Sequence, residues 1–230
     1  LLRALGRRTG TCFQRCVGLD ALNALYSVTC EMDASLGTGY HARLVSFIRY
    51  VQENDLMCAG SMTDAKGDRS RRPSQQEDPD MFVRVVERIP DGIVLRGAKM
   101  HQTGIVNSHE MIILPTLGLR EEEAAYAVAC AVPVDAPGVT HILGRQTNDL
   151  RKLEENCLDM GNSRFGVVGG EALTVLDGVF VPWERVFMCG EHAFSSVLVE
   201  RFASYHRQNY GGCKAGVADV IIGAAWLAAD

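Results

Sequence analysis

The sequence has no uninterrupted apolar run of about 18 residues, the length at which a helix crosses a membrane, so we expect no membrane-spanning segment. It has no basic block beyond the short run Arg69–Arg72, and its net charge of −5 disfavours nucleic-acid binding. It also lacks a secretory signal, and its eight cysteines do not form a dense disulfide framework. These absences favour a cytoplasmic protein that binds neither nucleic acid nor membrane.

Length and composition allow a sizeable core. The chain has 230 residues, of which 47% are hydrophobic, and a chain of this length forms one or two domains. It begins at Leu1 rather than at methionine, and it ends inside an apolar run with helical spacing. We therefore interpret it as an internal fragment of a longer protein.

The spacing of apolar residues changes twice along the chain. Helical spacing extends from about Cys12 to Asn54 with a break at Gly37–Gly39, and it returns from His192 onward. Between these segments, β-prone runs are separated by turn residues, and Pro90-Asp91-Gly92 predicts a hairpin. We predict an α+β fold with helical segments flanking a central β domain. Its parts are a helical domain over 1–59, the β domain over 60–191 and the start of a second helical domain over 192–230.

Two pairs of possible metal ligands, one near each end of the chain, are the strongest chemical signal. Cys12 and Cys16 stand four residues apart, and His206 and Cys213 stand seven apart. Both spacings place side chains on one face of a helix. If the two helices pack together, three thiolates and one imidazole converge, a set that suits structural zinc or an iron–sulfur cluster. Buried cysteines that simply fill a core are the alternative.

Two adjacent glycines strengthen the metal interpretation. Gly211 and Gly212 interrupt a helical stretch immediately before Cys213, and each costs roughly 1 kcal/mol relative to alanine there. We expect something to approach the helix backbone closely at this point.

The middle of the chain carries a second group of polar residues. The segment Gly97–Glu110 ends a β-prone run with closely spaced donors and acceptors, which suit a polar ring system such as a flavin. The loop Met62–Arg69 has the composition of an ordinary solvated loop. Glu171 follows Gly169-Gly170 and is either an inward-facing acid or a charge at a strand edge.

Together these segments resemble the 4-hydroxybutyryl-CoA dehydratase family of the 4-hydroxyphenylacetate 3-hydroxylase flavoprotein superfamily. The resemblance rests on CFQRCVGLD, MTDAKGDR, GAKMHQTG, VNSHE, GGEALTVLDGVFVPWERVF and VERFASYHRQNYGGCK. It implies an acyl-CoA-dehydrogenase-like fold, here with its C-terminal helical domain truncated, and a homotetramer with an acyl-CoA substrate. It also implies FAD, a [4Fe–4S] cluster, and radical-type dehydration of 4-hydroxybutyryl-CoA to crotonyl-CoA with vinylacetyl-CoA isomerisation.

The resemblance also assigns roles to individual residues. The cluster ligands are Cys12, Cys16, His206 and Cys213. The catalytic residues are His206, Tyr210, Lys214, Glu171, Gln14 and Thr103. The flavin-binding residues are Met62, Thr63, Asp64, Lys66, Gly67, Asp68, Arg69, His101, Gln102 and Thr103.

Two other functions account for part of the sequence. A flavin-dependent aromatic hydroxylase of the 4-hydroxyphenylacetate type explains the middle segments but leaves the Cys/His quartet without a purpose. A non-catalytic protein with a structural Cys3His zinc site explains the quartet but not the flavin-like loops.

Overall fold

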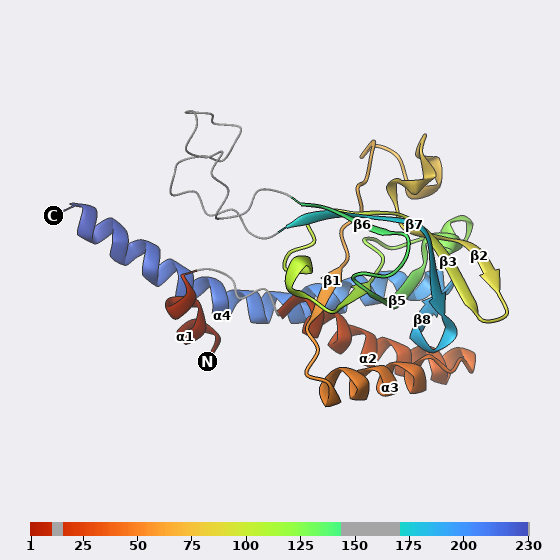
Figure 1. Cartoon of the computed structure of the whole chain (residues 1–230), viewed down its shortest axis with the longest axis horizontal. Helices are drawn as coiled ribbons and strands as arrows, with labels where there is room; N and C mark the ends of the chain where they lie inside the picture. Colours follow the sequence, from red (N-terminus) through yellow and green to blue (C-terminus); the bar gives the residue numbers. More distant parts are fainter. Residues whose placement is uncertain (11–15, 144–170, 230) are drawn as a thin grey trace.

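Two four-stranded sheets form the centre of the molecule, with helices from both ends of the chain packed around them (Figure 1). The structure is a computed structural model, and it describes residues 1–10, 16–143 and 171–229. The predicted α+β arrangement of helical segments around a central β region is confirmed. Cys12, Gln14 and the glycine pair before Glu171 lie outside the described residues.

The first sheet has the order β1-β4-β5-β8 and contains the most buried strands. Its strands are β1 (Cys58–Ser61), β4 (Glu110–Ile113), β5 (Val128–Pro133) and β8 (Val186–Cys189). Strand β1 pairs with β4 in parallel, whereas the other pairings are antiparallel. Residues 128–132 of β5 are all buried, because both faces of this strand are covered.

The second sheet has the order β2-β3-β7-β6 and is antiparallel throughout. Its strands are β2 (Arg84–Ile89), β3 (Gly92–Lys99), β6 (Val139–Leu143) and β7 (Ala172–Pro182). Ile89 pairs with Gly92 across the turn, so the hairpin predicted at Pro90-Asp91-Gly92 is confirmed. The sequence did not reveal β1 and β8, which have only four residues each.

Three helices precede the sheets. They are α1 (Leu2–Thr9), α2 (Cys16–Leu36) and α3 (Tyr40–Glu53). Helix α2 buries Leu22, Leu25, Val28 and Met32, whose spacing of three and four residues forms one apolar face. The predicted break between α2 and α3 is confirmed at Gly37, which has a left-handed φ of 67°. Helix α1 was not expected from the sequence.

The long helix α4 (Ser195–Ala229) returns across the molecule and extends past it toward the C-terminus (Figure 1). Its first turns bury Leu198 and Phe202, and it contacts α2 and then α1. The two segments with the predicted metal ligands, α2 and α4, are therefore neighbours although they lie at opposite ends of the chain.

Helix α4 also corrects one expectation. The helical stretch from His192 to Ala229 contains an 18-residue window with a mean hydropathy of 1.4, which by length and composition alone is enough to cross a membrane. Lys214 and Asp219 interrupt the apolar part of this helix, so the sequence still has no uninterrupted apolar run of that length. The correction is that the lack of such a run does not by itself exclude a helix of sufficient hydropathy. Trp226 and Leu227 are 73% and 83% exposed near its end.

Candidate active site

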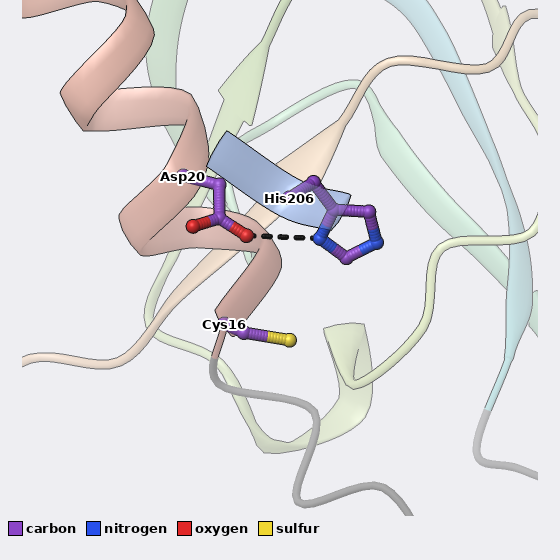
Figure 2. A group of neighbouring side chains, drawn as sticks. All are labelled: Cys16, Asp20 and His206. Carbon is purple, nitrogen blue, oxygen red and sulfur yellow. Dashed lines mark hydrogen bonds and ion pairs between the residues drawn. The ribbon is translucent and has the colours of Figure 1, made fainter. Parts of the chain in front are cut away.

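Three side chains from α2 and α4 converge at the contact between these helices. One ligand atom from each of Cys16, Asp20 and His206 lies within 4.8 Å of the others (Figure 2). Cys16 and Asp20 lie one helical turn apart on α2, and His206 reaches them from α4. The structure thus brings together two of the four predicted metal ligands, one from each helix.

Asp20 holds the imidazole of His206. Its Oδ2 lies 2.9 Å from Nδ1 of His206, and its Oδ1 accepts a hydrogen bond from the side-chain amide of Asn209. Asp20 is fully buried, whereas the side chain of His206 keeps 28% exposure. Phe202 stacks on the imidazole with a centroid separation of 5.5 Å. The ring is therefore fixed on one edge and one face, and Nε2 points away from Asp20 (Figure 2).

Cys213 lies on the same helix as His206 and is buried. It is not one of the three residues whose ligand atoms converge, and the fourth predicted ligand, Cys12, is outside the described residues. Helix α1 passes directly over this part of α4, because a β-carbon at Gly6 would collide with the carbonyl oxygen of Cys213. The convergence of all four ligands stays a prediction.

The two glycines before Cys213 differ in their surroundings. A β-carbon at Gly212 would lie 2.9 Å from Cβ of Leu2, so α1 approaches the α4 backbone there as the sequence predicted. A β-carbon at Gly211 would meet nothing within 4 Å among the described residues. The close approach is therefore confirmed for Gly212 only.

The donor chemistry of this cluster fits a soft metal centre. A thiolate and an imidazole are ligands of both zinc and iron–sulfur clusters. A ligating histidine characteristically donates the N–H of its second ring nitrogen to a carboxylate, and Asp20 occupies such a position beside Nδ1 of His206.

Two further predicted residues follow His206 along α4. The ring of Tyr210 lies 5.9 Å from the imidazole, and Nζ of Lys214 lies 5.0 Å from the centre of the Tyr210 ring. Tyr210 is about half exposed, and Lys214 is exposed. Tyr210 and Lys214 therefore extend along α4 from the imidazole of His206, and the ammonium group of Lys214 lies over the face of the Tyr210 ring.

The predicted flavin loop begins where β1 ends and is anchored by a buried ion pair. Nζ of Lys99 lies 2.8 Å from Oδ1 of Asp64, and it also donates to the carbonyl oxygens of Met62 and Leu114. Burial lowers the pKa of Lys99, and Asp64 opposes that shift. Asp64 also accepts from the backbone N–H of Val83 and from the hydroxyl of Thr116. Both oxygens of Asp64 are therefore engaged by the protein itself.

The rest of this loop faces two hollows on the surface. Lys66 and Arg69 line one of about 450 Å³, together with residues that include Arg71, Arg72, Phe82 and Thr116. Gly67 and Asp68 line a neighbouring one of about 420 Å³. Thr63 contributes its carbonyl oxygen to a hydrogen bond from the N–H of Met100, which ties the loop to the end of β3.

A second predicted group assembles between β3 and β7. The hydroxyl of Thr103 donates to Oε1 of Glu171 over 2.9 Å, and Nδ1 of His101 lies 3.5 Å from Oε2. Gln102 is buried, and its Oε1 has no hydrogen-bond partner among the described residues. A flavin has ring N–H and carbonyl groups that need such partners, so these residues fit it. Glu171 is an acid facing Thr103 and His101 rather than an isolated strand-edge charge.

Three residues of this arrangement were not found from the sequence. Asp20 follows Cys16 by four residues, and Asn209 follows His206 by three, so helical spacing was an available signal for both. Lys99 lies in the motif GAKMHQTG, but the sequence did not assign it a role. Only the folded arrangement shows that it is 1% exposed and paired with Asp64.

Comparison with known proteins places the chain in one family. A family model described as 4-hydroxyphenylacetate 3-hydroxylase N terminal matches residues 1–188, and the corresponding C-terminal model matches residues 195–230. The chain is 57% identical over 229 residues to the 4-hydroxybutyryl-CoA dehydratase/vinylacetyl-CoA-Delta-isomerase of Clostridium aminobutyricum. That match covers 99% of the chain and 46% of the relative.

Solved structures show the same relationship. An oxygen-tolerant archaeal 4-hydroxybutyryl-CoA dehydratase from N. maritimus matches with a TM-score of 0.88 at 53% identity, over 97% of this chain and 44% of that one. The FAD complex of a 4-hydroxyphenylacetate 3-monooxygenase oxygenase component matches with a TM-score of 0.75 at 23% identity, over 98% and 46%. Butyryl-CoA dehydrogenase from Megasphaera elsdenii matches with a TM-score of 0.59 at 15% identity, over 95% and 48%.

These matches confirm the predicted acyl-CoA-dehydrogenase-like fold and the resemblance to the dehydratases. The chain spans about half the length of the relatives it matches. With both family models matched in order along its length, the chain belongs to the 4-hydroxyphenylacetate 3-hydroxylase family.

Proposed function

We propose that this chain is part of an enzyme that dehydrates 4-hydroxybutyryl-CoA to crotonyl-CoA and isomerises vinylacetyl-CoA. The observation that carries the proposal is the meeting of Cys16 and His206 from opposite ends of the chain, with Asp20 behind the imidazole. An aromatic hydroxylase has no need for this soft donor set. The 57% identity to a dehydratase supports the same choice.

The proposed cofactors are FAD and a [4Fe–4S] cluster. Cys12, Cys16, His206 and Cys213 would hold the cluster, and the loop Met62–Arg69 with His101, Gln102 and Thr103 would hold the flavin. When bound, FAD exchanges electrons with the substrate and the cluster iron supplies a Lewis acid for the departing hydroxyl. Oε1 of Gln102, which has no hydrogen-bond partner within the part of the chain that the structure describes, supports the flavin site. The imidazole backed by a carboxylate supports the metal site.

Residues of this chain would supply the proton transfers and the binding contacts. Glu171, oriented by Thr103, is the proposed acid–base group beside the flavin. Tyr210 and Lys214 are the proposed donors to the hydroxyl that leaves, because they follow His206 along α4. Gln14 is proposed to line the same pocket, because it stands between Cys12 and Cys16 in the sequence.

We also infer the assembly and the location of the whole protein. It is a homotetramer in the cytoplasm, and this chain contributes a helical domain over 1–59, a β domain over 60–191 and the start of a second helical domain over 192–230. Exposed apolar side chains near the end of α4, among them Ile221, Trp226 and Leu227, support burial of this surface against further protein.

A turnover assay tests the function directly. The full-length protein, purified without oxygen, should convert 4-hydroxybutyryl-CoA to crotonyl-CoA, measured by mass spectrometry of the thioesters. His206→Gln should abolish this conversion, whereas His141→Gln should not, because His141 binds Thr174 and the carbonyl oxygen of Val134 within the second sheet. Hydroxylation of 4-hydroxyphenylacetate with reduced flavin and oxygen, without dehydration, would replace the proposal with the hydroxylase alternative.

A further inference from the structure

Asp20 is a fully buried acid at the contact between α2 and α4, and none of the proposed chemical steps uses it. Both of its oxygens are engaged, Oδ2 by Nδ1 of His206 at 2.9 Å and Oδ1 by the side-chain amide of Asn209. A carboxylate that already binds two partners through separate oxygens is a poor candidate for a metal ligand. Its chemistry acts through the histidine instead.

The hydrogen-bonding capacity of the three groups fixes their protons. A carboxylate only accepts hydrogen bonds, so the nitrogen of His206 that faces Asp20 must carry a hydrogen and Asn209 must present its NH2 group. A neutral imidazole protonated at Nδ1 has its lone pair on Nε2. Nε2 lies on the edge of the ring that faces away from Asp20 (Figure 2).

We infer that Asp20 is a positioning residue that selects the Nδ1–H tautomer of His206 and thereby presents Nε2 to the cluster iron. Asn209 fixes the carboxylate from its other oxygen. This inference rests on the proposed function, because it assumes that His206 is a cluster ligand. It adds a role for two residues that lie outside the predicted ligand set.

Asp20 also joins α2 to α4, so a purely structural role must be separated from control of the tautomer. Asp20→Asn does this with almost no change of volume. With Asn209 donating to one corner of the side chain as it does in the structure, the new amide turns its oxygen toward Asn209 and its NH2 group toward His206. Nδ1 would then have to accept, which moves the proton to Nε2 and removes the lone pair from the ligand position. Asn209 can instead turn over its own amide and accept, so Asp20→Leu, which offers Nδ1 no acceptor in either case, is compared alongside.

A compensating variant makes the opposite prediction. In the double variant Asp20→Asn/Asn209→Asp, the introduced carboxylate accepts from the new amide. The amide oxygen is then left to accept from Nδ1–H of His206, so the ligating tautomer returns. Asn209→Ala leaves Asp20 and its hydrogen bond to Nδ1 in place, so it should retain the histidine ligand.

The experiment compares these variants in the full-length protein, reconstituted and kept without oxygen, with histidine labelled by ¹⁵N. Two quantities are measured: the rate at which iron is lost to a ferrous chelator, and the ¹⁵N hyperfine coupling of the reduced cluster by pulsed EPR. Asp20→Asn should lose iron roughly 10- to 100-fold faster and lose the nitrogen coupling. The double variant should recover both. Glu110→Gln is the control and should change neither quantity. It replaces another buried acid, which forms an ion pair with Arg185.

The outcomes distinguish failure of the role inferred for Asp20 from failure of the proposed function. A wild-type cluster with nitrogen coupling that survives unchanged in both Asp20→Asn and Asp20→Leu overturns the role of Asp20 and leaves the proposed function intact. Wild-type protein that binds no iron overturns both. If Asp20→Asn does not fold, the double variant and Asn209→Ala still test the inference, because loss of the nitrogen coupling in either of them contradicts it.

Discussion

Gly18 of helix α2 lies directly against the backbone of Cys58 in strand β1, since a β-carbon at Gly18 would collide with the Cys58 carbonyl oxygen. The contact is reciprocal at the adjacent residue of the helix, because a β-carbon at Gly60, two residues further along β1, would lie 2.6 Å from the side chain of Val17. Cys16 precedes Gly18 by two residues, and β1 leads into the loop Met62–Arg69. This contact therefore fixes the proposed metal-ligand helix relative to the proposed flavin loop.

Gly18→Ala should destabilise the chain by about 1–3 kcal/mol, because the added methyl group forces α2 away from β1 against a backbone atom that cannot move aside. The free energy of unfolding by urea measures this. Asn23→Ala, at an exposed position of the same helix, is the matched control and should stay within about 0.5 kcal/mol of the parent. Equal stability of the two variants would show that the helix and strand are not in direct contact.

The adjacent glycines of α4 should respond differently to alanine. Gly211→Ala should stabilise the helix by up to about 1 kcal/mol, because the new side chain has space and alanine favours a helix interior. Gly212→Ala gains the same helix propensity but has to displace Leu2 of α1, so its net effect should be smaller or destabilising. Thermal unfolding of the two variants side by side measures the difference, and the reverse order would contradict the packing of α1 on α4.

Glu123 should make the stability of the chain sensitive to acid. Burial by itself would raise the pKa of Glu123, but hydrogen bonds from Arg72 and from the Arg120 N–H outweigh it and hold the pKa below the ordinary value of 4.5. A carboxyl whose pKa is lowered by folding contributes stability that is fully present above pH 4.5 and is lost as the pH falls through the folded value.

Glu123→Gln should therefore cost about 1.5–3 kcal/mol at pH 7 and should flatten the loss of stability between pH 4.5 and lower values. Urea midpoints over this pH range are the measurement. Glu122→Gln is the control, because Glu122 is the residue next to Glu123 but is exposed. Its Oε1 lies 3.8 Å from a guanidinium nitrogen of Arg120. An unchanged acid transition in Glu123→Gln would mean that the pair with Arg72 does not control it.

Thr103→Val should slow turnover without unfolding the protein, because it removes the hydroxyl that donates to Glu171 and keeps the shape of the side chain. A hydrogen bond to a charged group is worth about 1.5–3 kcal/mol, so kcat should fall on the order of 10-fold or more while KM changes little. Thr103→Ser retains the hydroxyl and should stay near the parent rate. A Thr103→Val enzyme with full activity would remove Thr103 from the proposed site.

Local patterns predicted most of the elements. The hairpin at Pro90-Asp91-Gly92 and the break at Gly37–Gly39 depend on residues next to one another, and both are confirmed. The four residues of β1 have little strand propensity of their own and form a strand because β4 lies beside them in parallel. Helix α1 likewise depends on a distant contact, where Gly6 allows it to pack on α4.

The candidate site, like the fold, could be predicted from the sequence only in part. Spacing predicted that each pair of ligands shares one face of its helix, with convergence only if the two helices pack together. The packing of α2 against α4 brings Cys16 and His206 close to each other. Asp20 and Asn209 have polar side chains of ordinary type, and only that packing turns both toward the imidazole. Thr103 and Glu171 are 68 residues apart, and the sequence could not show that β3 and β7 pair between them.

Cofactor content tests the central claim most directly. The full-length protein, purified without oxygen, should contain about four iron and four sulfide with one flavin per subunit, measured by metal analysis, acid-labile sulfide and absorbance. That result would support the dehydratase and leave only the exact 4-hydroxyacyl-CoA substrate to be assayed. Flavin without iron would contradict the cluster and favour a hydroxylase, and zinc without flavin would contradict both enzymes.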